Sequence, residues 1–155
     1  MRGGPAKKRP ILIDPIYKSK IVTRMINAAM RGGKKSVAES IVYGALEKLS
    51  NDRKEATRIF EESVKNVMPL QEVRSRRVGG ATYQVPIPVK YDRAEALALK
   101  WIIQAARSKK GRPMVDKLYE ELKGAQEGVG DSIKKREDTH RMAEANRAFA
   151  HFARY

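Results

Sequence analysis

The chain has 155 residues and a mass of 17.5 kDa, enough for one hydrophobic core and too short for two. Its 33 Lys and Arg against 18 Asp and Glu give a formal net charge of +15, which indicates an anionic partner, either nucleic acid or an acidic membrane surface. The absence of cysteine excludes disulfides and thiolate chemistry, and the longest uncharged run, the 12 residues Val78–Val89, is too short for a membrane-spanning helix, which needs about 20 apolar residues.

The positive charge is concentrated at the N-terminal end of the chain. Residues 1–35 hold ten Lys and Arg against one acidic residue, whereas residues 36–70 have a net charge of −1. Four of these bases lie in Met1–Pro10, together with two glycines, two prolines and no apolar periodicity. We therefore predict a flexible basic arm over residues 1–10, with no apolar segment behind it that resembles a secretion signal.

Helical periodicity predicts three helices before residue 70. The first is expected to open at Asp14-Pro15, because an aspartate can cap a helix and proline suits its first turn, and to stop at Gly32-Gly33. Ser36–Glu39 has the spacing of a capping box and predicts the start of the second helix, and the third fits Glu55–Val67. The predicted buried faces are Tyr17, Ile21, Met25, Ala28 and Ala29; Val37, Ile41, Ala45 and Leu49; and Ala56, Phe60, Val64 and Val67.

The apolar period changes from helical to two residues after residue 71. Glu72–Val78 and Ala81–Val89 flank Gly79-Gly80, a pair suited to the tight turn of a hairpin. Neither face is wholly apolar, so we predict a β-ribbon over residues 72–89 that projects from the body. The expected register pairs Val78 with Ala81, Arg76 with Tyr83 and Arg74 with Val85. One face then carries Arg74, Arg76 and Tyr83, and the other carries Arg77, Thr82 and Gln84.

Three more helices are predicted after the ribbon. The fourth begins near Asp92, the fifth follows the basic loop 108–112 and ends among the glycines at 124, 128 and 130, and the last runs without a break to Phe152. Their predicted buried faces are Leu99, Trp101, Ile102, Ile103 and Ala106; Val115, Leu118, Tyr119 and Leu122; and Met142, Ala145, Phe149 and Phe152. The fourth and last helices are expected to present cationic faces of Arg93, Lys100 and Arg107, and of Arg136, His140, Arg147, His151 and Arg154.

These elements predict a mainly α fold without a catalytic site: a six-helix domain, with one extended β-hairpin projecting from it, over residues 1–155. His140 and His151 lie about 16 Å apart along a helix, so they cannot ligate one metal ion. Gly32–Ser36 lacks the glycine spacing of a phosphate loop and follows a helix rather than a strand. We therefore expect neither an enzyme nor a bound cofactor.

The arginines of the predicted ribbon indicate binding to folded RNA. Arg74, Arg76 and Arg77 can pair with phosphates, and Tyr83 beside Arg76 offers a surface on which a base can stack. Bases are spread over an arm, a loop, a ribbon and helix faces, which suits RNA helices that meet at irregular angles better than one groove of a uniform duplex. Two alternatives stay open at this point: a DNA-architectural protein, and a nuclease, for which no acidic cluster is visible.

Four stretches of the chain carry a longer pattern. The first is Lys20-x-Val22-x-x-x-Ile26, followed by Gly33-Lys34-Lys35 and Ile41-Val42-x-x-Ala45. The others are Glu72–Pro86, Ala96–Arg107 and Lys135–Phe152. Together they resemble the family of small-subunit ribosomal protein seven, in its bacterial and organellar form. The resemblance covers residues 8–152, and departures from the family pattern fall in loop 108–112 and at residues 153–155.

The resemblance implies a structural constituent of the small ribosomal subunit, in the cytoplasm or an organelle, that binds the 3′ major domain of 16S-type ribosomal RNA and nucleates assembly of the subunit head. It implies small-subunit ribosomal proteins nine and eleven, exit-site tRNA and mRNA as neighbours, and neither a membrane nor a small-molecule substrate. The residues implied to face ribosomal RNA are Lys7, Lys8, Arg9, Lys20, Arg31, Lys34, Lys35, Arg74, Arg76, Arg77, Tyr83, Arg93, Lys100, Arg107 and Arg112. Those implied to lie near tRNA and mRNA are Gly79, Gly80, Arg141 and Arg147.

Overall fold

The computed structural model describes residues 3–4 and 10–154. Within these ranges the chain forms six α-helices, one antiparallel hairpin and a terminal 3-10 helix, which confirms the mainly α class with a β-ribbon. In chain order the elements are α1 (Lys20–Ala29), α2 (Lys35–Leu49), α3 (Arg53–Val67), β1 (Gln71–Val78), β2 (Ala81–Pro88), α4 (Tyr91–Ser108), α5 (Met114–Glu127), α6 (Asp131–Ala145) and η1 (Arg147–Arg154). Most of the arm predicted over residues 1–10 falls outside the described residues.

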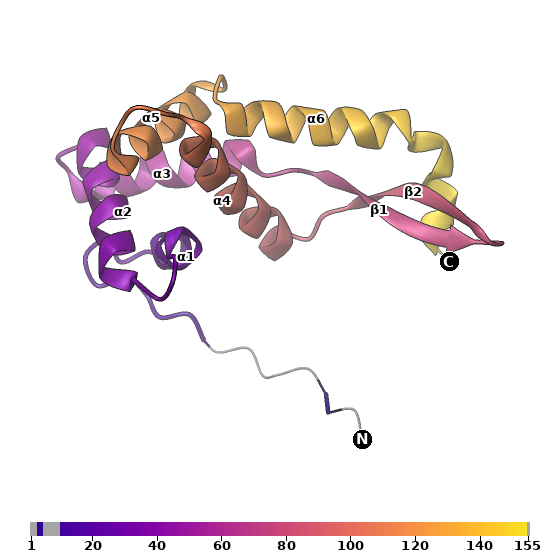
Figure 1. Ribbon diagram of the computed structural model, residues 1–155, viewed down its shortest axis with the longest axis horizontal. Helices are drawn as coiled ribbons and strands as arrows, with labels where there is room; N and C mark the ends of the chain where they lie inside the picture. Colours follow the sequence, from indigo (N-terminus) through magenta and orange to yellow (C-terminus); the bar gives the residue numbers. More distant parts are fainter. Residues whose placement is uncertain (1–2, 5–9, 155) are drawn as a thin grey trace.

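Figure 1 shows an elongated molecule with a helical body at one end and the hairpin at the other. Helices α1–α5 form the body, and α6 leaves it to run beside the hairpin, where it contacts β1 and β2. η1 then lies against β2, so the C-terminal end of the chain returns to the hairpin. The register pairs Arg76 with Tyr83 and Arg74 with Val85, as the Gly79-Gly80 turn predicts. The ribbon therefore projects from the body with two C-terminal elements beside it.

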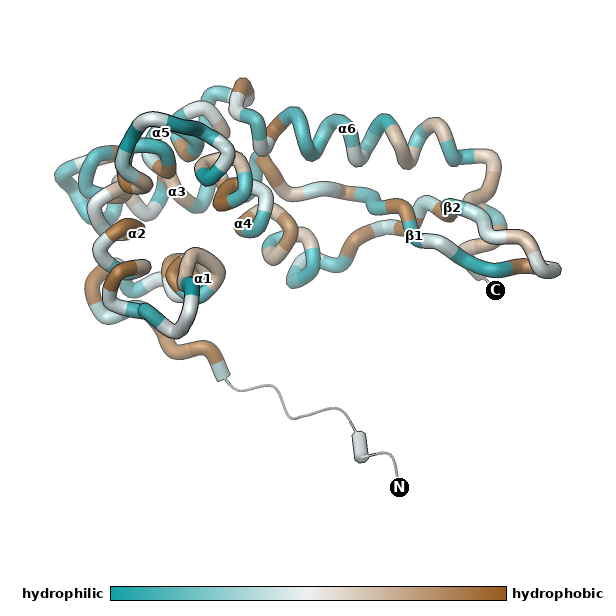
Figure 2. Tube along the Cα trace, in the orientation of Figure 1, coloured by the Kyte–Doolittle hydropathy of each residue, from teal (hydrophilic) through white to brown (hydrophobic). Residues whose placement is uncertain are grey.

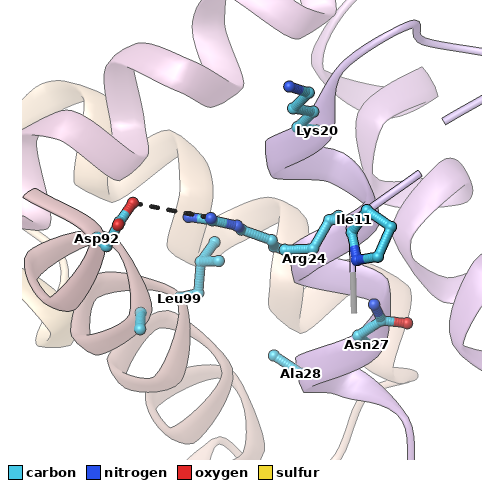
Figure 3. A pocket seen from close by; sticks show the side chains of 9 residues that line it. Ile11, Lys20, Arg24, Asn27, Ala28, Asp92 and Leu99 are labelled. Atoms are coloured by element: carbon cyan, nitrogen blue, oxygen red, sulfur yellow. Dashed lines mark ion pairs between the residues drawn. The ribbon is translucent and has the colours of Figure 1, made fainter. Parts of the chain in front are cut away.

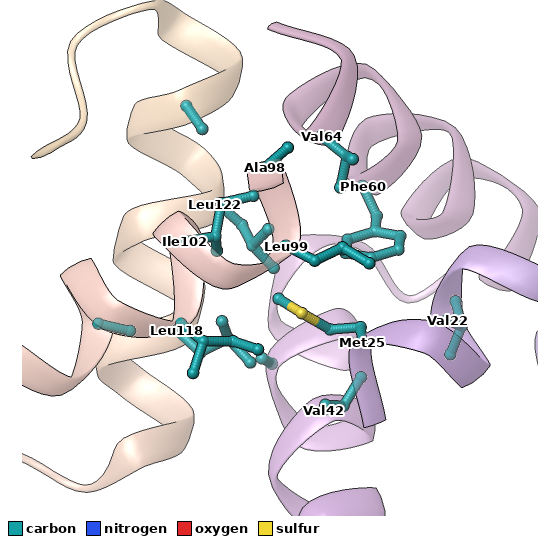
Figure 4. Close-up of a cluster of buried hydrophobic side chains, with 14 of the residues drawn as sticks. Val22, Met25, Val42, Phe60, Val64, Ala98, Leu99, Ile102, Leu118 and Leu122 are labelled. Atoms are coloured by element: carbon teal, nitrogen blue, oxygen red, sulfur yellow. The ribbon is translucent and has the colours of Figure 1, made fainter. Parts of the chain in front are cut away.

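The core of the body combines one apolar face from each of α1–α5 (Figure 4). The buried faces predicted for α3 and α4 are confirmed, and Phe60, Trp101 and Ile102 are at most 8% exposed. Helix α6 contributes less to this core, and Figure 2 shows that it is hydrophilic over most of its length. The central side chains are Val22, Met25, Val42, Phe60, Val64, Ala98, Leu99, Ile102, Leu118 and Leu122.

The prediction that the first helix begins at Asp14-Pro15 is wrong, because α1 begins only at Lys20. The Asp14 carboxylate instead caps a turn: its Oδ2 accepts hydrogen bonds from the backbone N–H groups two and three residues along, at 3.0 and 2.8 Å. Lys18 then has a φ of +51°, which lies outside the right-handed helical region, so no α-helix can run through this residue. The Tyr43 hydroxyl donates to Asp14 Oδ1 at 2.6 Å, so this turn is fixed to α2. A capping aspartate followed by proline is equally suited to a turn.

The capping box expected at Ser36–Glu39 is also wrong. Helix α2 begins at Lys35 with Lys34 as its N-cap, so Ser36 lies inside the first turn. Gly33, with a φ of +75°, places the helix start before the serine. The buried face is rotated accordingly, and Val37 is 53% exposed. The buried residues of α2 are Ala38, Val42, Ala45 and Leu46, of which only Ala45 belongs to the predicted face.

The single last helix expected up to Phe152 is broken at Asn146. Beyond it the chain continues as the 3-10 helix η1, which brings two aromatic rings onto the hairpin. The Tyr83 ring centroid lies 5.3 Å from that of Phe149 and 4.9 Å from that of Phe152. These three rings are the aromatic cluster of the ribbon. Met142, predicted to be buried, is 55% exposed.

The first half of the expected cationic face on the last helix points to the body instead of to solvent. An Arg136 Nη1 donates to the backbone carbonyl of Asn66, at the end of α3. The backbone N–H of Leu70 donates to His140 Nε2 at 3.0 Å. These two side chains fix α6 to the link between α3 and β1. Desolvation first, and Arg136 second, lower the pKa of His140.

A buried glutamate joins α5 to α6. The expected end of the fifth helix lies at Gly128, which has a φ of +78°, so α5 passes through Gly124. Glu121 is 1% exposed, and its Oε1 accepts from the backbone N–H and hydroxyl of Ser132 at 2.9 and 2.7 Å. Its Oε2 lies 3.1 Å from Lys109 Nζ, so the buried charge is paired.

We predict that Gly130→Ala destabilises the fold by about 1–3 kcal/mol, through overpacking. Gly130 has a φ of −71°, so its backbone suits alanine, but a Cβ there lies 2.6 Å from Glu121 Oε1 and 3.3 Å from the backbone nitrogen of Ala125. Urea unfolding followed by circular dichroism measures the loss. Gly4→Ala, where a Cβ meets nothing within 4 Å, is the control. Equal midpoints for both variants contradict the prediction.

We also predict that stability falls as the pH drops from about 7 to about 5.5, in part through His140. The folded-state pKa of His140 is lowered from its usual 6.5, so on acidification this histidine is protonated in the unfolded chain before it is protonated in the folded protein. The contribution of neutral His140 to stability is therefore complete above pH 6.5 and is lost as the pH falls below that value. Protonation also removes the acceptor for Leu70. In His140→Gln the amide oxygen can still accept this bond, so the urea midpoint should vary less with pH. The same pH dependence in both proteins contradicts the prediction; His151→Gln, on η1, is the control.

Candidate nucleic-acid interface

The base of the ribbon brings two of the predicted RNA-facing arginines together. Glu72, at the start of β1, lies 2.9 Å from an Arg74 nitrogen and 3.5 Å from Arg93 Nε. Its carboxylate therefore connects the ribbon to the first turn of α4. Two guanidinium groups share one carboxylate, so this junction keeps a net positive charge and both arginines are held in place.

Helix α4 carries the predicted basic stripe. Arg93, Lys100 and Arg107 are all exposed, and 14 residues of helix spread them over about 21 Å. Lys100 has no carboxylate partner in the described part of the chain. Arg107 donates from Nη2 to the carbonyl of Ala29, the last residue of α1, at 3.0 Å. Desolvation first and Arg31 second lower the pKa of Arg107, which remains fully charged at neutral pH.

The turn between α1 and α2 adds to this stripe. Arg31 and Lys34 line a hollow of about 290 Å³ together with Arg107, so three predicted bases from two parts of the chain meet here. Gly32 and Gly33 have φ values of +59° and +75°, and this left-handed pair turns the chain so that both bases face the hollow. The third predicted base of this turn, Lys35, is the first residue of α2 and forms an ion pair at 3.5 Å with Glu39, one helical turn along.

A groove of about 720 Å³ lies between α1 and α4, beside the stripe (Figure 3). Lys20, another predicted base, lines it. Arg24, which the sequence reasoning missed, extends across it and donates to Glu95 at 2.7 Å. Glu95 is 3% exposed, and Asp92 lies 3.8 Å from the other Arg24 nitrogen. A glutamate among the apolar residues of α4 is the only signal for this pair in the sequence.

The ribbon itself differs from the predicted binding surface at Tyr83. Tyr83 is half-buried and its ring contacts Phe149 and Phe152, so η1 covers part of the surface that was predicted to stack on a base. Arg77 lies on the opposite face, is exposed, and has no carboxylate partner among the described residues. At the tip, Gly79 and Gly80 have φ values of +58° and +89°, as a tight hairpin turn requires.

Other predicted residues lie away from this basic surface or outside the described chain. Arg112 forms an ion pair with Glu120 of α5. On α6 and η1, Arg141 and Arg147 each pair with an acidic residue three positions earlier, both at 3.3 Å. The arm bases Lys7, Lys8 and Arg9 are outside the described residues.

The structure groups the predicted bases of the ribbon, α4, the α1–α2 turn and the start of α1 on one surface. We call this surface the basic face, and its residues are Arg74, Arg93, Lys100, Arg107, Arg31, Lys34 and Lys20.

Two other kinds of site are absent from residues 3–4 and 10–154. In these ranges, no three His, Asp or Glu side chains lie close enough together to hold a metal ion. No helix there is both long and apolar enough to cross a bilayer.

Comparison with known proteins gives one consistent family. The family model described as ribosomal protein S7p/S5e matches residues 1–147. A protein of Thermosipho africanus named small ribosomal subunit protein uS7 is 56% identical over 98% of this chain and 99% of its own length. Proteins of the same name from Fervidobacterium nodosum and Kocuria rhizophila are 54% and 49% identical, over 98% and 97% of this chain and 99% and 97% of their own lengths. The chain belongs to the ribosomal protein S7p/S5e family.

Proposed function

We propose that this protein is a structural constituent of the small ribosomal subunit and binds the 3′ major domain of its ribosomal RNA through the basic face. The observation that carries the proposal is the convergence of bases from three separate elements, the ribbon base, α4 and the α1–α2 turn. The names of the relatives support the ribosomal role. Family membership also confirms that the chain is not an enzyme.

The mechanism is the stabilisation of one RNA junction geometry. Bases that are about 10 Å apart along α4 can each neutralise a phosphate, and those of the α1–α2 turn reach a second RNA segment. Two of these cations are held by contacts inside the protein, Arg93 by Glu72 and Arg107 by the carbonyl of Ala29, so these two side chains lose little freedom on binding. RNA helices held at a fixed angle then offer later proteins their sites, which is how we propose that assembly of the subunit head begins.

The far end of the molecule has a second proposed role. The tip Gly79-Gly80 projects beyond the body, and Arg141 and Arg147 lie on the elements beside the ribbon. Exposed ion pairs of this kind contribute little to stability, so both arginines can exchange their carboxylates for phosphates. We place this end near the exit-site tRNA and the mRNA, with small-subunit ribosomal proteins nine and eleven as neighbours, and residues 1–155 as one RNA-binding domain.

A competition experiment tests the proposal. Labelled 3′ major-domain ribosomal RNA is bound to the full chain at moderate salt and challenged with duplex DNA, then with an unrelated structured RNA. We expect neither competitor to displace the RNA until it is in large excess, because binding depends on RNA shape. Displacement mole for mole by both competitors overturns the proposal, because binding is then a non-specific effect of the net charge of +15.

We predict that changing Arg74, Arg76 and Arg77 together to Ala weakens binding to this RNA. If each arginine contacts one phosphate, the slope of log affinity against log salt concentration becomes shallower by about 2–3. Filter binding over a range of salt concentrations measures both effects. The matched control changes three exposed bases of α3, Arg53, Lys54 and Lys65, to Ala. Equal losses from the two triple variants contradict a specific role for the ribbon.

A further inference from the structure

The groove between α1 and α4 has the features of a site for a single unpaired nucleotide. Its apolar lining comes from three segments and consists of Pro10, Ile11, Ala28, Ala96 and Leu99. Leu99 is 3% exposed and closes the floor, whereas Ala28 and Ala96 are exposed on the facing sides of α1 and α4. Two alanines leave room for a planar ring between the helices. The volume of about 720 Å³ exceeds what one nucleotide fills, so its neighbours in the RNA can enter from the open side.

Arg24 gives this groove a rigid planar group. Its guanidinium is fixed from two directions, by Glu95 Oε1 at 2.7 Å and by Asp92 Oδ1 at 3.8 Å. The side chain keeps 32% of its surface exposed, and Figure 3 shows it extended across the groove. Bases of single-stranded RNA stack on guanidinium planes as well as on aromatic rings. Because two carboxylates compensate its charge, Arg24 is better suited to stacking than to binding a phosphate.

The charges around the groove select the kind of occupant. Lys20 lines it, and Lys100 lies one helical turn beyond Ala96 on the same exposed side of α4. Neither lysine has a carboxylate partner among the residues that the structure describes, so both can hold the phosphates that flank an inserted base. Asn27, at the edge of the groove, offers an amide donor and acceptor to the edge of a base.

A protein segment fits these features less well. An amphipathic helix needs apolar anchors over several turns, and the apolar lining here is limited to five side chains, two of them alanines. We infer that an unpaired nucleotide of the bound RNA inserts between α1 and α4, stacks on the Arg24 guanidinium and is flanked by phosphates at Lys20 and Lys100. This inference rests on the proposed function and identifies the part of the basic face that recognises a base rather than the RNA backbone.

The test fills the groove without changing any charge. Ala96→Phe in the full chain places a ring in the space meant for the base. Asn51→Phe makes a similar increase in bulk at an exposed position between α2 and α3, outside the groove lining and the basic face, and is the control. Affinity for 3′ major-domain RNA is measured over a range of salt concentrations, and the reactivity of unpaired bases to dimethyl sulfate is measured in the complex.

We expect Ala96→Phe to weaken binding about tenfold, as loss of one stacked base does. The salt slope should stay unchanged because no phosphate contact is lost, and a base protected by the wild-type protein should become reactive again. Wild-type affinity and protections in Ala96→Phe overturn the inference and leave the groove to another occupant. Equal losses in both Phe variants, or a shallower salt slope, overturn it as well. The proposed function fails separately, when the wild-type protein shows no preference for this RNA.

Arg24→Lys examines the stacking surface itself. Lysine keeps the charge and can still pair with Glu95, but it has no plane. A loss of about tenfold at an unchanged salt slope supports stacking. Wild-type affinity in Arg24→Lys overturns the role of this side chain. The urea midpoint of the variant, measured in parallel, separates lost binding from a weakened fold, and Ala96→Phe remains decisive where the fold is weakened.

Discussion

A carboxylate that is removed from water must be paired, and this constraint organises the described chain around Asp14, Glu95 and Glu121. Asp14 joins the turn before α1 to α2 through Tyr43. Glu95 joins α4 to α1 through Arg24, and Glu121 joins α5 to the first turn of α6. Glu95 and Glu121 pair with Arg24 and Lys109, and Asp14 with Tyr43 and backbone N–H groups, so none of the three carboxylates pairs with a base of the basic face. The arrangement that fixes the helices therefore leaves the basic face with a net positive charge.

Regular elements were predictable where one periodicity dominates the local sequence. The faces of α3 and α4 follow from a single apolar stripe, and the hairpin register follows from Gly79-Gly80. Element ends were not predictable in the same way. Asp14 caps a turn and Ser36 lies inside a helix, because neighbouring residues with left-handed φ values decide where the chain turns. Beyond the break at Asn146, Phe149 contacts Tyr83 across more than 60 residues of sequence, and no local pattern contains this contact.

The candidate site was predictable as a set of bases and less so as a surface. Charge spacing identified the stripe on α4, and the family resemblance supplied the α1–α2 turn. Neither indicates that Arg112 pairs with Glu120, or that η1 covers the ring of Tyr83. The pair of Arg24 with Glu95 spans 71 residues of sequence, so only the packing of α1 on α4 reveals it. Sequence reasoning thus located the cations, but it did not identify the carboxylates that pair with them or the rings that cover Tyr83.

The aromatic cluster of the ribbon has a consequence for the order in which this chain acquires its shape. A lone two-stranded hairpin is marginally stable in water, and the two phenylalanines that cover Tyr83 come about 60 residues after β2 ends. A ribosome adding about 5–20 residues per second takes roughly 3–12 s to make that stretch. During this interval the nascent chain has a ribbon without its cover. The helical body can form first, and the outer end of the molecule becomes ordered only after η1 has been made.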